Sequence, residues 1–97
     1  SGDEKFDRIF REGRELMDKE EWKQAAAKFS EIVCDCPENK RVDAAFYWLA
    51  YCYKKQKMYK ETDATIERLL KNFPNSEWAN DARVLRYETA TTVYGVR

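Results

Sequence analysis

Side chains that could carry out catalysis or bind a metal ion are scarce in this sequence. It contains no histidine, which removes the commonest general base and metal ligand. Cys34 and Cys36 stand two residues apart, so on a helix their thiols point to opposing sides and are poorly placed to share one ion. We expect Cys34 to be a buried structural residue. With Cys52 the cysteines number three, an odd count that does not suit a disulfide framework.

Other catalytic patterns are also missing. The adjacent carboxylates Glu20 and Glu21 belong to a polar, charged turn that is expected to be solvated, which does not suit an active site. No glycine-rich phosphate loop, GxSxG or Walker pattern is present. The sequence therefore predicts a protein that is not an enzyme and that holds no cofactor or metal.

The chemistry that remains is that of aromatic contact. The stretch 44–59 carries Phe46, Tyr47, Trp48, Tyr51, Tyr53 and Tyr59 within about four helical turns. One packing seam does not need so many aromatic side chains, so we expect this segment to have a packing face and a binding face.

Composition limits the kinds of partner. The chain has 97 residues, of which 37% are charged, with 18 basic and 18 acidic side chains that cancel. A general binder of nucleic acid or anionic membranes needs a basic excess, which is absent. No apolar run approaches the roughly 18–20 residues of a membrane span, so direct membrane insertion is not expected.

Helices must position the aromatic cluster. Apolar residues recur at three- and four-residue spacing over 3–19, 22–36, 39–57, 58–72 and 77–93. Asp3 is a plausible N-cap for the first segment and Ser76 for the last. Pro37 and Pro74 end the second and fourth. The pattern predicts an all-α chain of five helices joined by short turns, with neighbours antiparallel. The tail 91–97 is expected to fray.

The two helix pairs repeat one another when aligned on their prolines, at an offset of 37 residues. Gly13 then matches Ala50, and Phe29 matches Ile66. The remaining matched pairs are Leu16 with Tyr53, Ala25 with Thr62, and Ile32 with Leu69.

This pattern of large and small residues resembles the tetratricopeptide repeat (TPR), whose period is about 34 residues. The second unit matches through Phe46, Leu49, Ala50, Tyr53 and Pro74, and the first through Ile9, Gly13, Leu16, Ala25 and Phe29. Glu12, Thr62, Ile32 and Leu69 depart from the family pattern, and about three extra residues near 40–42 would lengthen the third helix. The resemblance implies a right-handed, five-helix TPR-type solenoid over residues 3–97. Its repeats would span 6–39 and 43–76, and the helix 77–93 would be a cap or half of a third repeat.

A narrower resemblance concerns compartment. The segment PNSEWANDAR after Phe73 is similar to bacterial cell-envelope TPR proteins of the Tol–Pal coordinator type and the outer-membrane assembly lipoprotein type. That similarity favours a bacterial periplasm or cell envelope. Unpaired cysteines instead fit a cytoplasm, which we keep as the alternative location.

In such a solenoid the first helices of successive pairs line a concave groove. The packing positions take Phe46, Leu49, Ala50 and Tyr53, which leaves other side chains of the same helix for the groove. The candidate binding residues are Phe10, Arg14, Tyr47, Tyr51, Lys54 and Leu85. They form an aromatic, partly basic surface, although Tyr47 and Tyr51 could equally serve as packing against the neighbouring helices. The carboxylate clamp of chaperone-binding TPR proteins is not expected, because only Arg14 is cationic at its positions.

Two functions remain open. The first is a protein-interaction module that holds a peptide or protein segment in this groove. The second is a structural module that forms homo-oligomers or connects parts of a larger protein. A monomer with an open groove would favour the first, and a concentration-dependent dimer burying Tyr47 and Tyr51 the second.

Overall fold

The computed structural model describes residues 2–95 and contains five α-helices. They are α1 (Gly2–Asp18), α2 (Trp22–Asp35), α3 (Val42–Lys55), α4 (Tyr59–Asn72) and α5 (Ala79–Tyr94). No strand occurs between residues 2 and 95, so the all-α prediction is confirmed. None of these helices is long and apolar enough to cross a membrane.

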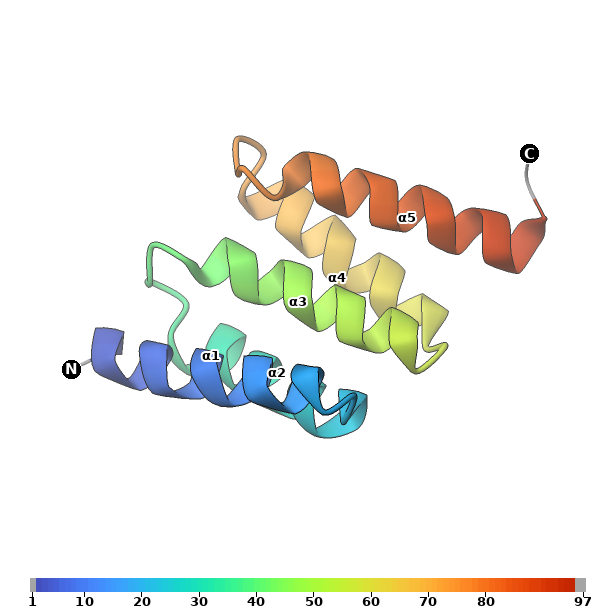
Figure 1. Cartoon of the computed structure of the whole chain (residues 1–97). Helices are drawn as coiled ribbons and strands as arrows, with labels where there is room; N and C mark the ends of the chain where they lie inside the picture. The colour runs from blue at the N-terminus through green and yellow to red at the C-terminus, as the bar shows by residue number, and fades with distance from the viewer. Residues whose placement is uncertain (1, 96–97) are drawn as a thin grey trace.

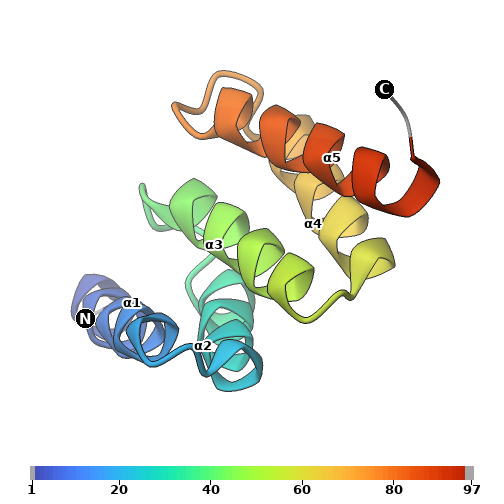
Figure 2. The same cartoon turned by 45° about the vertical axis from the view of Figure 1, so that its right-hand side comes forward.

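The helices form two layers, each helix running back along its predecessor. In Figure 1, α1, α3 and α5 lie in front and α2 and α4 behind, with the chain ends at opposite ends of the row. Figure 2 shows the same succession from the side. Each helix packs mainly on its neighbours in sequence, and α5 also touches α3. This nearest-neighbour packing is typical of helical repeat proteins.

Buried residues follow the apolar faces that the sequence predicts. Phe29 and Ile32 of α2 and Ile66 and Leu69 of α4 are completely buried. Thr62, which stands where the repeat pattern has a small apolar residue, is also completely buried. Its hydroxyl donates a hydrogen bond to the Met58 carbonyl at 2.9 Å, which satisfies the polar group locally.

The turns recur between the two helix pairs. Glu20 and Lys57 both have positive φ (57° and 62°), and they are 37 positions apart. Glu21 N–H donates to the Leu16 carbonyl just as Met58 N–H donates to that of Tyr53. The recurrence continues after each proline. The side chains of Asn39 and Ser76 each accept a hydrogen bond from the backbone N–H of the residue two positions later.

This recurrence corrects the expectation that extra residues near 40–42 lengthen the third helix. The third helix is not lengthened: it begins at Val42, and the preceding residues form a connection that recurs at the same length before α5. Val42 N–H donates to Asn39 as Ala79 N–H donates to Ser76. The connection between helix pairs therefore accounts in both places for a period of 37 residues in place of the usual period of about 34.

Several helices also begin or end at residues other than those predicted from the sequence. Helix α1 already includes Gly2, so Asp3 lies in its first turn rather than at the N-cap. Trp78 is the N-cap of α5, and Ser76 instead supports the turn before it. The fifth helix continues through Tyr94 to Gly95, which adopts the left-handed conformation (φ 64°) that commonly ends helices. Fraying was predicted for 91–97; residues 96 and 97 lie outside the described range.

Candidate functional site

Helix α3 places three aromatic side chains on the layer shared with α1 and α5. Tyr47, Trp48 and Tyr51 are all half-buried, whereas Leu49 and Ala50 point into the core and are almost completely buried. The division follows from helical geometry, because residues three or four apart share a face. The prediction of two different faces for this segment agrees with this burial pattern.

These three rings join two tryptophans in a continuous set that we call the aromatic ladder: Trp22, Tyr51, Trp48, Tyr47 and Trp78. Successive ring centroids are 5.8, 5.5, 5.1 and 5.0 Å apart. Most contacts are edge-to-face, and Tyr47 stacks on Trp78 at 28°. Separations of this size are favourable for aromatic pairs. The ladder thus connects the start of α2, the middle of α3 and the start of α5.

Cations lie against the ladder. The Arg14 guanidinium of α1 is 4.7 Å from the centroid of Trp48. The Lys55 ammonium is 5.4 Å from Trp22 and 5.6 Å from Tyr51. Each distance suits a cation–π interaction. Positive charge is therefore held on the aromatic surface by α1 and α3.

A cleft of about 440 Å³ opens beside the ladder, between α3 and α5. Its lining combines tyrosines with three lysines and one glutamate; the residues are Tyr47, Tyr51, Lys54, Lys55, Lys57, Tyr59, Leu85 and Glu88. Across it, Lys54 Nζ lies 3.3 Å from Glu88 Oε1 and so links the two helices. This ion pair is partly exposed, so it stabilises the fold by only about 0–1 kcal/mol and is easily exchanged for another partner.

Burial raises the pKa of the Tyr47 hydroxyl, and the negative charges of Asp81 and Glu88 and the neighbouring Tyr51 raise it further. The hydroxyl therefore keeps its proton well above neutral pH and can donate a hydrogen bond into the cleft. In the aromatic ladder, Trp48 Nε1 is a buried donor without a hydrogen-bond partner in the structure, which is uncommon.

The structure brings four of the six candidate residues to this cleft: Tyr47, Tyr51, Lys54 and Leu85. Arg14 lies nearby, on Trp48. Phe10 does not reach the cleft. Its ring is only 9% exposed and packs on Phe6 and Phe29 at 5.4 and 5.5 Å. Phe10 is therefore not a cleft residue as predicted, because its ring completes the small core of the first helix pair.

Sequence reasoning missed two residues of the aromatic ladder beside the cleft and two lysines that line the cleft. Trp48 lay between two faces on a helical wheel, and its place became clear only when Arg14 and Trp78 were positioned around it. Trp22 belongs to a different helix, and no local spacing relates it to Tyr51. The line Tyr47, Tyr51, Lys54 does continue to Lys55 and Lys57, so a wider window on the basic end of α3 would have found those lysines.

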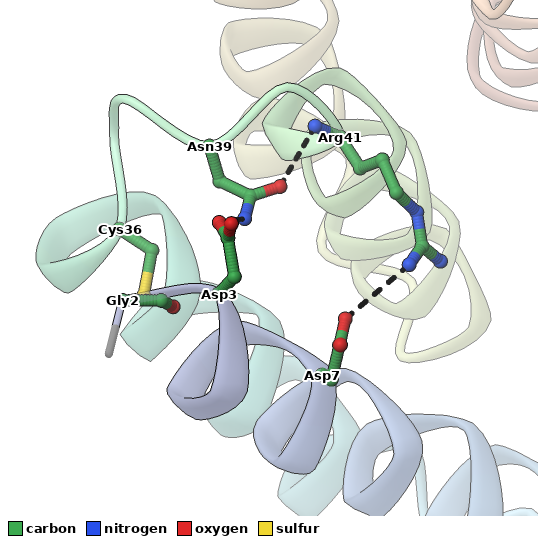
Figure 3. A network of polar contacts seen from close by, with 6 residues as sticks. All are labelled: Gly2, Asp3, Asp7, Cys36, Asn39 and Arg41. Atoms are coloured by element: carbon green, nitrogen blue, oxygen red, sulfur yellow. Dashed lines mark hydrogen bonds and ion pairs between the residues drawn. The ribbon is translucent and has the colours of Figure 1, made fainter.

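A second cleft, of about 490 Å³, lies where the connection 36–41 crosses the start of α1. Its polar groups already pair with one another, as Figure 3 shows: Asn39 donates to Asp3 at 2.8 Å, and Arg41 reaches Asp7 at 3.4 Å. Arg41 also covers Phe10, with its guanidinium 5.0 Å from the ring centroid. These groups hold the fold together, which makes this cleft the weaker candidate for a ligand.

The cysteines differ from expectation. Cys34 is exposed, whereas Cys36 and Cys52 are buried, and all three are free thiols. Cys34 lies on the outer face of α2, and the helical turn carries Cys36 inward at the end of that helix. Among residues 2–95 no cluster of three or more His, Cys, Asp or Glu side chains has the arrangement of a metal site.

Comparison with known proteins gives one result. Residues 3–94 match the family model YfiO, described as an outer membrane lipoprotein. Neither the curated proteins nor the solved structures gave a match. The matched range covers nearly all of the five-helix row, including the cleft and the aromatic ladder. The chain therefore belongs to the YfiO family of outer membrane lipoproteins, a bacterial cell-envelope family.

Proposed function

We propose that the chain is a protein-binding module of the bacterial cell envelope that holds a segment of a partner protein in the cleft between α3 and α5. The observation that carries the proposal is that the predicted line Tyr47, Tyr51 and Lys54 of α3 meets the predicted Leu85 of α5 at one aromatic, basic cleft. Family membership supports the compartment. The helix pairs and their recurring turns support a TPR-type module, and such modules commonly use the layer of first helices for binding.

The lining indicates the chemistry of the segment. Tyrosines offer large apolar surface with little loss of side-chain entropy, and they are enriched among the residues that dominate binding energy. Lys54, Lys55 and Lys57 outnumber Glu88 on the rim. We therefore infer that the bound segment carries aromatic or apolar side chains together with carboxylates.

Binding can be followed through the protein's own fluorescence, because Trp48 and Trp78 belong to the ladder. The probe is an extended eight-residue peptide that alternates Phe with Glu, and its matched control alternates Phe with Lys. The Glu peptide should change tryptophan emission saturably and bind at least about 10-fold more tightly than the Lys peptide.

Variants separate binding from folding. Tyr47→Ala and Tyr51→Ala should each weaken binding of the Glu peptide by about 30-fold or more, the effect of losing an anchor worth about 2 kcal/mol. Tyr87→Ala is the matched control, because Tyr87 is 59% exposed on another side of α5. Circular dichroism should report an intact helical domain for all three. Equal binding by Tyr51→Ala and the parent chain would reject the cleft as the binding site.

A further inference from the structure

Helix α5 presents an exposed face that points away from the cleft. Val84, Tyr87, Val93 and Tyr94 are 56%, 59%, 44% and 74% exposed, and they are the large apolar side chains exposed within residues 2–95. All four lie on this one helix, where Tyr87 and Tyr94, seven residues apart, share the outward face, and Val84 and Val93 flank it on opposite sides. In Figure 1, α5 forms the upper edge of the row, with no helix beyond it. An apolar concentration on one element commonly marks an interaction surface.

The recurrence at 37 residues identifies what this face corresponds to in the other units. Arg83, Arg86, Tyr87 and Ala90 of α5 stand where α3 has Phe46, Leu49, Ala50 and Tyr53. In α3 that side packs on its partner helix: the Arg68 guanidinium of α4 lies 4.8 Å from the Phe46 ring centroid, and Phe73 lies 5.9 Å away. The same side of α1 meets α2 at Gly13. On α5 it is uncovered by any described helix.

The residue types on this side of α5 differ from those that α2 and α4 cover, above all at the place of Tyr87. Gly13 and Ala50 are small because the partner helix comes close, and a Cβ added to Gly13 would lie 2.8 Å from Phe29. Tyr87 occupies the equivalent place on α5 and would hold a helix away. Arg83 stands where α1 and α3 have Ile9 and Phe46, and Arg86 stands where they have Glu12 and Leu49. Glu12 pairs with Lys28 of α2 at 3.1 Å, so a charge at this place is covered by an opposite charge. The surface that covers Arg83 and Arg86 must therefore supply carboxylates.

We propose that this outward face of α5 docks an acidic α-helix of a partner protein. Arg83 and Arg86 are three residues apart and exposed, so their guanidiniums can reach carboxylates on one helix. The Arg83 guanidinium donates to Asn80 on its own helix at 3.2 Å, which orients it without neutralising it. Tyr87 and Tyr94 supply apolar contact surface next to the two arginines and further along the helix.

A second copy of this chain is a poorer fit. The acidic group at the start of α1 is already engaged, because Asp3 pairs with Asn39 and Asp7 with Arg41. Arg41 would have to leave both Asp7 and the Phe10 ring for another copy to use that carboxylate. The surface is also separate from the proposed cleft, which uses Leu85 and Glu88 on a different side of α5.

The test uses a 16-residue helical peptide with Leu and Ala on its contact face and Glu at flanking positions three and four residues apart. A matched peptide carries Lys at those positions. On the isotope-labelled chain, the Glu peptide should shift amide resonances over residues 83–94. The Arg83→Glu/Arg86→Glu variant should bind it at least about 10-fold more weakly and should prefer the Lys peptide. Tyr51→Ala should bind it as the parent chain does.

Three results would overturn the proposal. One is a failure of the expected binding, seen either as equal binding of the Glu and Lys peptides by the parent chain or as no shift of any α5 amide resonance at millimolar peptide. Another is a set of shifts confined to the cleft around Tyr51. The third is a concentration-dependent dimer in sedimentation that the Arg83→Glu/Arg86→Glu variant abolishes, which would assign the face to a second copy. Circular dichroism of the double variant verifies that an exposed substitution has not unfolded the domain.

Discussion

Single residues show how tightly the first helix pair is packed. A Cβ placed on Gly13 would lie 2.8 Å from Phe29 Cζ, closer than real Cβ contacts allow. Alanine favours a helix by about 1 kcal/mol over glycine, but overpacking a core costs about 1–3 kcal/mol. The packing term wins, so glycine at this position reflects the approach of α2 and not a break in α1.

We predict that Gly13→Ala lowers the free energy of unfolding by up to about 2 kcal/mol, measured by urea denaturation. Gly2→Ala is the control, since an added Cβ there meets nothing within 4 Å. It should change stability by less than about 0.5 kcal/mol. A more stable Gly13→Ala variant would show that Phe29 moves aside at little cost.

The buried Cys52 thiol predicts a pH dependence. Burial raises its pKa from 9.0 to about 12. Because the folded chain binds this proton more tightly than the unfolded chain, the stabilisation is fully present below pH 9 and is lost as pH rises toward 12. Comparing unfolding free energies from pH 8 to 11, the parent chain should lose more stability than Cys52→Ala. Parallel curves for the two proteins would contradict the assignment.

At the scale of elements, the connections between helix pairs repeat the same hydrogen-bonding arrangement. Two residues after each proline, a polar side chain reaches back to an aspartate near the start of the same unit's first helix. Asn39 donates to Asp3 at 2.8 Å, and Ser76 donates to Asp43 at 2.6 Å. The second pair is partly buried and the first is exposed. A hydrogen bond to a charged group is worth more where water competes less.

Replacing these two side chains should therefore have unequal effects. Ser76→Ala should cost about 1.5–3 kcal/mol of unfolding free energy, because it leaves the Asp43 carboxylate short of a donor. Asn39→Ala, at the equivalent position, should cost about 1 kcal/mol or less. Chemical denaturation of both variants measures the difference, and equal losses would show that exposure does not govern this contact.

At the scale of the whole molecule, stability should be uneven along the row of helices. Helix α3 packs on α2 and on α4, whereas α5 packs on α4 and only lightly on α3. In a chain of nearest-neighbour contacts, an end helix can open without disrupting the rest. The exposed face of α5 adds no compensating contact.

Native-state hydrogen exchange should resolve this difference. Amides of α5 should exchange through an opening that is about 1–3 kcal/mol less costly than the opening that exposes α3. A helical peptide bound to α5, as proposed above, should slow exchange there first. Uniform protection across all five helices would instead describe a single cooperative unit.

Much of the architecture could be predicted from local pattern. Apolar spacing and the two prolines located five helices, because a helix face and a helix break are properties of neighbouring residues. The same spacing separated Leu49 and Ala50 from Tyr47 and Tyr51. The repeat match at 37 residues followed from the sequence alone. The extra residues expected near 40–42 lie in the connection and do not lengthen the third helix, because hydrogen bonds across the unit hold that connection.

Tertiary structure decided the candidate site. Whether an aromatic side chain lies in the core or at the surface depends on its neighbours. Phe10 packs in the core against Phe6 and Phe29. Trp22 and Trp78 instead contact the tyrosines of α3 from other parts of the chain. Sequence by itself determined the helices, their order and the basic, aromatic character of α3, since those depend on residues a few positions apart. Only the packing of separate helices determined the cleft, because its walls come from residues more than thirty positions apart that meet across α3 and α5.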